Sequence, residues 1–169
     1  MNSEIGEMLM LWTVRCSVAC YVVALWQWLF AERFPDAQYR RFWTAAWLLC
    51  VVHVICAFHF RHHWDHDVAI QHTANMTEGV VGIHWGGGLY INYVFLVCWG
   101  TSVAGTWRQT PAVRRITQQL TGGMHAFVAF MMINATVVFG PAWWWIPMAL
   151  VLTVITWNYK RRRSATVQN

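Results

Sequence analysis

The stretch Phe42–Phe60, FWTAAWLLCVVHVICAFHF, contains no aspartate, glutamate, lysine or arginine. Because an α-helix rises about 1.5 Å per residue, this stretch is long enough to cross the roughly 30 Å hydrocarbon core of a bilayer. The rest of the chain has the same character, since 57% of its 169 residues are hydrophobic and only 11% are charged, well below the roughly 25% of a soluble domain. The sequence therefore predicts an integral membrane protein with no separate catalytic domain outside the bilayer.

Further apolar runs on both sides of this stretch predict an all-α transmembrane helix bundle formed by one domain, residues 1–169. We expect about five spans, at residues 8–30, 42–60, 80–104, 120–139 and 143–159. Gly140 and Pro141 permit a tight turn between the last two. The last run is short and contains Pro147, so a four-span arrangement is the alternative.

The charged residues predict the orientation, with the N-terminus outside and the C-terminus in the cytoplasm. Ten of the 12 basic residues fall on the expected cytoplasmic side: Arg33, Arg40, Arg41, Arg108, Arg114, Arg115, Lys160, Arg161, Arg162 and Arg163. Five of the seven acids fall on the other side: Glu4, Glu7, Asp65, Asp67 and Glu78. This is the distribution of the positive-inside rule, so the net charge of +5 needs no nucleic-acid partner to explain it.

The same reasoning predicts the location of the chain. The first apolar run follows an acidic N-terminus, which is unlike a cleavable signal peptide, so we expect this run to be retained as a span. A bacterial inner membrane suits such a chain. A histidine-rich connection, residues 61–79, would then face the periplasm, and the basic tail, residues 160–169, would face the cytoplasm, where it can contact anionic lipid.

Seven of the eight histidines lie between His53 and His84, and they predict a metal or cofactor site. If the second helix continues past the membrane edge, the turn of about 100° per residue places His59, His62, His63 and His66 on one face. A spacing of i, i+4 on a helix lets two imidazoles reach one metal ion.

Further donors stand in the same region of the chain. They are Asp65, Asp67, His72, Glu78 and His84. Imidazole and carboxylate ligands suit Cu, Zn or Fe, and the absence of a CxxC pair disfavours a thiolate site. Gly82 and Gly86 form a GxxxG pattern that predicts close approach of another helix or a flat cofactor. The alternatives are a pH-responsive cluster and ordinary interfacial histidines.

Haem or a chlorophyll-type tetrapyrrole is the second cofactor interpretation. His53, His84 and His125 lie in three different predicted spans. Only His59 and His84 would share one depth, as a bis-histidine haem requires, whereas a pigment needs a single axial ligand. Arg15, within the first span, would pair with an acidic group such as a propionate or snorkel to the interface.

These observations predict an accessory subunit of a larger membrane complex, in contact with other membrane subunits and carrying the histidine-rich site at its outer face. Three alternatives stay open. The chain would be a membrane metal-dependent oxidoreductase or hydrolase using the same histidines, a tetrapyrrole-binding subunit of an electron-transfer or photosynthetic complex, or a purely structural subunit. No motif that we recognise in the sequence identifies a substrate or catalytic residues.

Overall fold

The computed structural model describes residues 2–30, 36–108 and 110–167, and these residues are almost entirely helical, with no strand among them. The long helices are α1 (Asn2–Phe30), α2 (Ala37–Cys56), α3 (His66–Val81), α4 (Gly88–Trp107), α5 (Pro111–Ile133) and α6 (Trp145–Val167). Three short elements join them, the π-helical turns η1 (Ala57–Arg61) and η2 (Asn134–Val138) and the 3₁₀ turn η3 (Ala142–Trp144). The predicted all-α class is confirmed for this part of the chain.

Four stretches are long and apolar enough to cross a membrane: Glu4–Phe30, Ala37–Arg61, Gly88–Trp107 and Pro111–Val138. They overlap the first four predicted runs and indicate a membrane protein. The last predicted run, 143–159, coincides with a shorter apolar helical segment, Ala142–Asn158. The described residues therefore supply four candidate spans and one shorter apolar helix where the sequence predicts about five spans.

The predicted start of the third span at residue 80 is wrong. Val80 and Val81 instead end α3, and Gly82 stops that helix with a left-handed backbone, φ 73°, a conformation that glycine adopts without steric cost. The span begins only at Gly88. Gly82 and Gly86 therefore do not form a helical GxxxG surface, because neither residue lies on a transmembrane helix.

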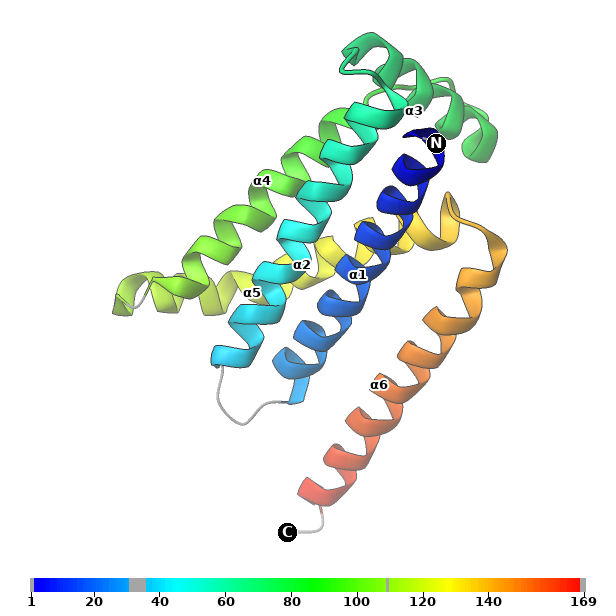
Figure 1. Ribbon diagram of the computed structural model, residues 1–169. Coiled ribbons are helices and arrows are strands. Elements are labelled where there is room, and N and C mark those ends of the chain that lie inside the picture. The colour runs from blue at the N-terminus through cyan, green and yellow to red at the C-terminus, as the bar shows by residue number, and fades with distance from the viewer. Residues whose placement is uncertain (1, 31–35, 109, 168–169) are drawn as a thin grey trace. The chain divides into compact units, whose positions relative to one another are not determined.

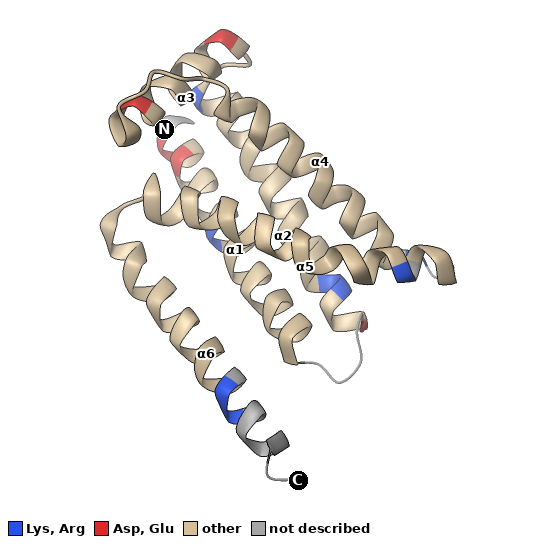
Figure 2. Ribbon diagram, turned by 180° about the vertical axis from the view of Figure 1, so that it is seen from behind, with Lys and Arg blue, Asp and Glu red and all other residues tan. Residues whose placement is uncertain are grey.

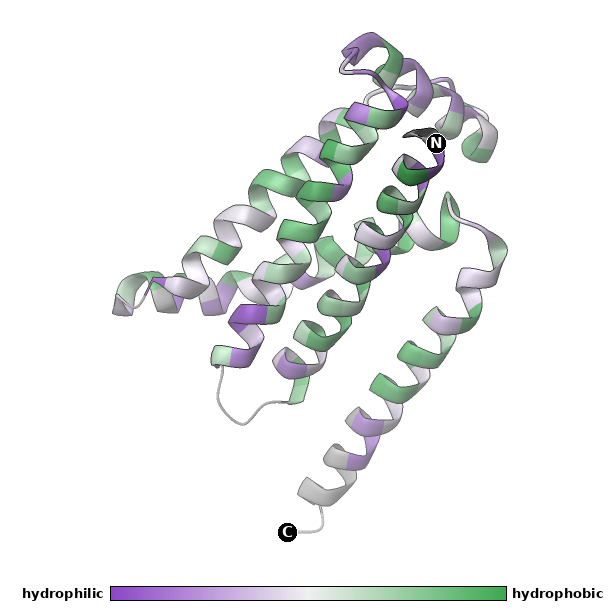
Figure 3. Ribbon diagram, viewed as in Figure 1, coloured by the Kyte–Doolittle hydropathy of each residue, from purple (hydrophilic) through white to green (hydrophobic). Residues whose placement is uncertain are grey.

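The described chain forms two compact units, residues 1–132 and 133–169. In the first unit, α1, α2 and α4 run side by side, α3 lies across one end of them, and α5 crosses α1 and α2 (Figures 1 and 2). Hydrophobic residues dominate α1, α2 and α4, whereas α3 is largely hydrophilic (Figure 3). This contrast is expected of a bundle of spans with one helix outside the apolar layer.

Polar contacts tie the spans of the first unit together at close range. The Ser17 hydroxyl on α1 donates to the Ala46 carbonyl on α2 at 2.7 Å, and the Trp47 indole donates to the Leu96 carbonyl on α4 at 3.0 Å. Gly100 leaves room for that indole, since a Cβ there would lie 2.8 Å from Trp47 Cζ2. Small residues at helix crossings of this kind are typical of membrane bundles.

Most charged residues in the first unit are separated along the bundle. Exceptions include Arg61, which ends η1 just before α3, and Asp36, the N-cap of α2. The acidic residues of α1 and α3 lie at one end, and Arg40, Arg41, Arg108 and Arg115 lie at the start of α2 and at the junction of α4 with α5 (Figure 2). The sidedness that follows from the positive-inside rule stays a prediction.

The second unit contains η2, η3 and α6. Residues 139–141 interrupt the helices between η2 and η3, as the glycine and proline there predict. Pro147 lies in the first turn of α6, which begins at Trp145. A proline in a first turn removes no helical hydrogen bond, so Pro147 does not interrupt α6.

Candidate functional site

The end of α2 does not continue as one straight helix through His66, and the predicted single-face array of four histidines is therefore wrong. The His62 amide donates to the Ala57 carbonyl at 3.1 Å, closing a π-helical turn. His63 and Trp64 then adopt left-handed backbone angles, φ 49° and 62°, and His66 begins a new helix, α3. We refer to residues 57–87, which include η1, α3 and the following turn, as the histidine segment.

The break in the helix is capped by a residue that the sequence assigned to metal binding. The Asp65 carboxylate accepts hydrogen bonds from the Asp67 and Val68 amides at 2.9 and 3.2 Å, which is the usual N-cap arrangement. Asp65 therefore fixes the start and direction of α3. Asp67 occupies the first helical turn, where a carboxylate is favoured by the helix dipole.

His62 and His72 are brought together by this change of direction. Their ring centroids lie 5.3 Å apart, with an interplanar angle of 53°. His62 is only 8% exposed, and its buried Nδ1 has no hydrogen-bond partner, while His72 is half-buried. The sequence singled out both residues but placed His72 outside the main array, because its position depends on where α3 begins.

Both imidazoles of this pair favour the neutral form. Burial, followed by the charges of His72, Arg61 and His63, lowers the pKa of His62 below its ordinary value. Burial and then the charge of Arg61 lower the pKa of His72 in the same way. Neutral imidazoles offer nitrogen lone pairs at neutral pH, which a metal ligand requires.

The Phe58 ring lies against His62 and also contacts a tyrosine of α4. Phe58 contacts His62 with ring centroids 5.6 Å apart, and Tyr93 on α4 lies 6.3 Å from Phe58. His66 contacts Tyr90 and Tyr93 at 5.8 and 6.0 Å. The predicted ligand His66 thus packs on the tyrosines of α4, and its ring has no contact with His62.

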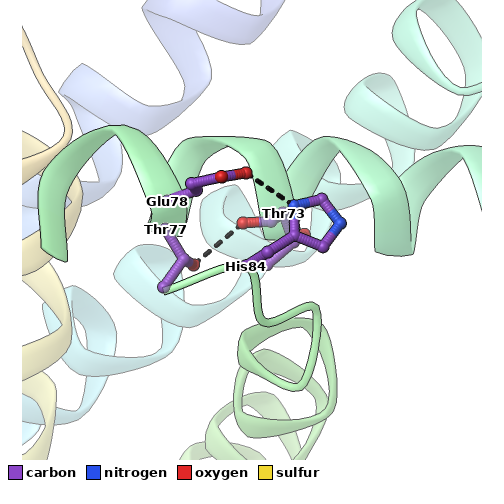
Figure 4. A network of polar contacts seen from close by, with 4 residues as sticks. All are labelled: Thr73, Thr77, Glu78 and His84. Carbon is purple, nitrogen blue, oxygen red and sulfur yellow. Dashed lines mark hydrogen bonds and ion pairs between the residues drawn. The ribbon is translucent and has the colours of Figure 1, made fainter. Parts of the chain in front are cut away.

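The other predicted ligands at this end lie apart from the pair. His59 Nδ1 accepts a hydrogen bond from the Trp64 indole at 3.2 Å, and His63 is exposed at the helix break. His84 lies in the turn before α4, where Nδ1 meets Glu78 Oε2 at 2.7 Å (Figure 4). These two side chains are 58% and 56% exposed. No ring contact or hydrogen bond joins His84 to His59, so the one bis-histidine haem pair that the sequence suggested is not brought together.

Figure 4 also shows how the Glu78 end of α3 is organised. The Thr77 hydroxyl donates to the Thr73 carbonyl one turn earlier at 2.8 Å. Glu78 reaches from this turn to the connection that follows the helix. The contact joins the two sides of the turn at Gly82.

His125 is the most enclosed histidine, and the residues around it were missed in the sequence. It is 2% exposed, its Nε2 lies 3.2 Å from the Tyr39 hydroxyl, and the Trp28 ring stacks on it at 4.6 Å with an angle of 20°. Trp43 contacts it at 4.6 Å, and the Tyr21 hydroxyl donates to its carbonyl at 3.0 Å. A tetrapyrrole face against this imidazole would have to displace these rings. We therefore assign His125 to packing between α5, α1 and α2.

The remaining candidates within the spans also have protein contacts. His53 Nδ1 lies 2.9 Å from the Met10 carbonyl, and the Arg15 guanidinium lies 5.6 Å from the ring centroid of Trp12. Trp12 and Arg15 lie three residues apart on α1, a spacing that brings two side chains together on one helix face. The contact of His53 with Met10 joins two different helices, so no spacing rule in the sequence reveals it.

Within the described ranges, no group of three or more His, Cys, Asp or Glu side chains is arranged to hold a metal ion. The histidine segment therefore offers a two-histidine pair rather than the extended ligand set expected from the sequence. No protein-family model, curated protein or solved structure matches this chain.

Proposed function

We propose that this chain is an accessory membrane subunit that binds one transition-metal ion through His62 and His72. The observation that carries the proposal is the separation of 5.3 Å between the two ring centroids. An imidazole nitrogen binds Zn at about 2.1 Å, so the metal lies about 3.2 Å from each ring centre, and a tetrahedral angle of about 109° gives a separation of about 5.2 Å.

Two features of the pair favour metal binding over simple packing. The buried Nδ1 of His62 lacks a hydrogen-bond partner, and a buried polar atom without a partner carries a cost of about 1–3 kcal/mol. A metal ion bound at Nδ1 would remove that cost. The lowered pKa values of both histidines keep the lone pairs available at neutral pH.

The incompleteness of the pair supports the accessory role. Stable zinc sites usually have three or four protein ligands, whereas the described part of the chain brings two together. The remaining positions would be filled by water or by side chains of a neighbouring subunit, so the metal would lie at a subunit boundary. From the basic-residue distribution, we place this boundary on the periplasmic side of a bacterial inner membrane. Imidazole donors suit Cu, Zn or Fe.

The test is the metal content per chain after purification in mild detergent without chelators. We expect near-stoichiometric metal in the natural chain, measured by elemental mass spectrometry. His62→Gln and His72→Gln should each lower the affinity by at least the roughly 10- to 100-fold that loss of an outer-shell partner costs. The matched controls are His63→Gln and His66→Gln, which remove an imidazole from the same segment and should retain the metal.

The pattern of loss separates this site from the alternatives. Equal loss in the His66→Gln control would restore the array predicted from the sequence. A coloured protein with a Soret band would favour the tetrapyrrole interpretation. Metal-free protein that co-purifies with other chains would favour a purely structural subunit and refute the proposed site. An oxidoreductase or hydrolase activity of the metal-loaded protein would support the enzyme alternative, and loss of that activity in His72→Gln would assign it to this pair.

A further inference from the structure

A second site is built from residues at the other end of the first unit. Arg40 lies at the end of the first turn of α2, with its guanidinium carbon 5.3 Å from the ring centroid of Trp107 at the end of α4. The Trp107 indole donates to the Thr44 hydroxyl on α2 at 2.9 Å, which fixes the ring under the guanidinium. Arg41 and Arg108 are the sequence neighbours of these two residues and are exposed. We refer to Arg40, Arg41, Trp107 and Arg108 as the Arg40 site.

No carboxylate that the structure describes forms an ion pair with the positive charges of this site. Among the described residues, Arg40, Arg41 and Arg108 form no ion pair, and Arg40 Nε is buried without a hydrogen-bond partner. Asp36 is the neighbouring acid, but its carboxylate accepts from the Tyr39 amide at 2.6 Å as the N-cap of α2. Three guanidinium groups are thus available to an anion from outside the chain.

The position of the Arg40 site at the ends of two candidate spans favours the phosphate of a lipid as its anion. The candidate span Ala37–Arg61 begins at this site, and the candidate span Gly88–Trp107 ends at it. Because both ends of spans meet here, the site is expected at the level of the lipid headgroups. Trp107 is half exposed, as tryptophans in an interfacial belt are. Arginine and tryptophan together suit a phosphate group at the boundary of the apolar layer.

An apolar stripe continues from the site along α4. Tyr90, Val94, Val97 and Trp107 are 54%, 57%, 65% and 50% exposed, and Thr101 and Ala104 continue the same exposed face at helical spacing. A soluble phosphate would gain nothing from this stripe, whereas the acyl chains of a phospholipid would cover it.

We propose that the Arg40 site binds the phosphate headgroup of one anionic phospholipid, with its acyl chains along α4. The orientation predicted from the basic residues places this lipid in the cytoplasmic leaflet, which carries the anionic lipids. The proposal is independent of the metal site, which uses residues at the opposite end of α2.

The test is native mass spectrometry of the full chain in detergent, titrated with phosphatidylglycerol and with phosphatidylcholine of the same acyl chains. We expect tighter binding of phosphatidylglycerol by the natural chain. One basic residue contributes about fivefold in affinity near a membrane surface, so Arg40→Gln with Arg108→Gln should weaken phosphatidylglycerol about 25-fold. Arg61→Gln, which removes the same charge from the other end of the α2–η1 helix, is the matched control and should bind normally.

A second measurement needs no variant and keeps the proposal testable if the double variant fails to fold. Raising the salt from about 50 mM to about 500 mM should weaken phosphatidylglycerol binding and leave phosphatidylcholine unchanged. Equal affinities for the two lipids, or equal losses in the Arg61→Gln control, would overturn the proposal. Thermal stabilisation by inorganic phosphate alone as large as that by phosphatidylglycerol would assign the site to a soluble anion instead.

Discussion

Replacing Gly86 by alanine should loosen the histidine segment, because this glycine lies directly under α3. A Cβ built at Gly86 would lie 2.5 Å from Ile70 Cγ2 and 2.8 Å from the Ile70 carbonyl oxygen. Carbon atoms in contact prefer about 3.5–4.0 Å, and carbon–oxygen contacts prefer about 3.3–3.6 Å. The isoleucine methyl can rotate away, but the carbonyl belongs to the helix backbone, so α3 itself would have to move by about 0.5–1 Å.

The magnitude follows from this displacement. Inserting a methyl group into a packed site typically costs about 1–3 kcal/mol. Because 1.4 kcal/mol is a factor of ten, the opening equilibrium of α3 should rise by about 5- to 140-fold. His72 is two residues beyond Ile70, so the shift should also separate the histidine pair and weaken metal binding.

Hydrogen–deuterium exchange of α3 in detergent measures this opening directly. Gly79→Ala is the matched control on the same helix, since a Cβ there meets nothing within 4 Å. Alanine is a better helix former than glycine by up to about 1 kcal/mol, so exchange in this control should be unchanged or slower. The same exchange rate in both variants would refute the idea that contact with Gly86 holds α3 in place.

Three further outcomes test other parts of the chain. Acidification below the ordinary histidine pKa of about 6.5 should destabilise the histidine segment, because the lowered pKa values of His62 and His72 mean that the unfolded state binds more protons. The contribution of these histidines to stability is therefore complete above about pH 6.5 and falls below it. Hydrogen-exchange rates measured from about pH 7.5 to about pH 5, compared with those of His62→Gln, check this. Tyr39→Phe should lower the melting temperature by leaving Nε2 of His125 without its hydrogen bond at 3.2 Å, at a cost of about 1–3 kcal/mol, which scanning calorimetry in detergent can detect. Glu78→Gln should change the melting temperature little, because the contact that it makes is more than half exposed and such pairs contribute about 0–1 kcal/mol; a large loss would contradict this.

The helical spans could be predicted from the sequence because their signal is local. Each run is long and nearly free of charge, so its position depends on few other residues. The start of the third span was wrong by several residues, since Val80 and Val81 are as apolar as residues within a span. The boundary differs because Gly82 adopts a left-handed backbone conformation that ends α3, so that the span begins only after the following turn. In the sequence, Gly82 was interpreted as part of a GxxxG pattern.

For the candidate site, the sequence predicted which residues take part but not how they are arranged in space. The sequence identified His62 and His72 as candidates, but the contact between them depends on where α2 ends. No residue type in Ala57–Arg61 predicts a π-helical turn. Asp65 illustrates the same difficulty, because a carboxylate directly before a helical stretch serves equally as a ligand and as an N-cap. The aromatic surroundings of His125 combine residues from α1, α2 and α5, so their assembly follows from packing between distant segments.

Because Ala57–Arg61 forms a π-helical turn, the number of residues in this stretch determines how the rest of the histidine segment is positioned. A π turn closes over one residue more than an α turn, as the bond from His62 to Ala57 shows. Deleting or inserting one residue here would rotate everything that follows by about 100° around the α2 axis and shift it by about 1.5 Å, with every side chain still present. In evolution, this stretch should therefore tolerate exchanges of side chains far better than insertions or deletions.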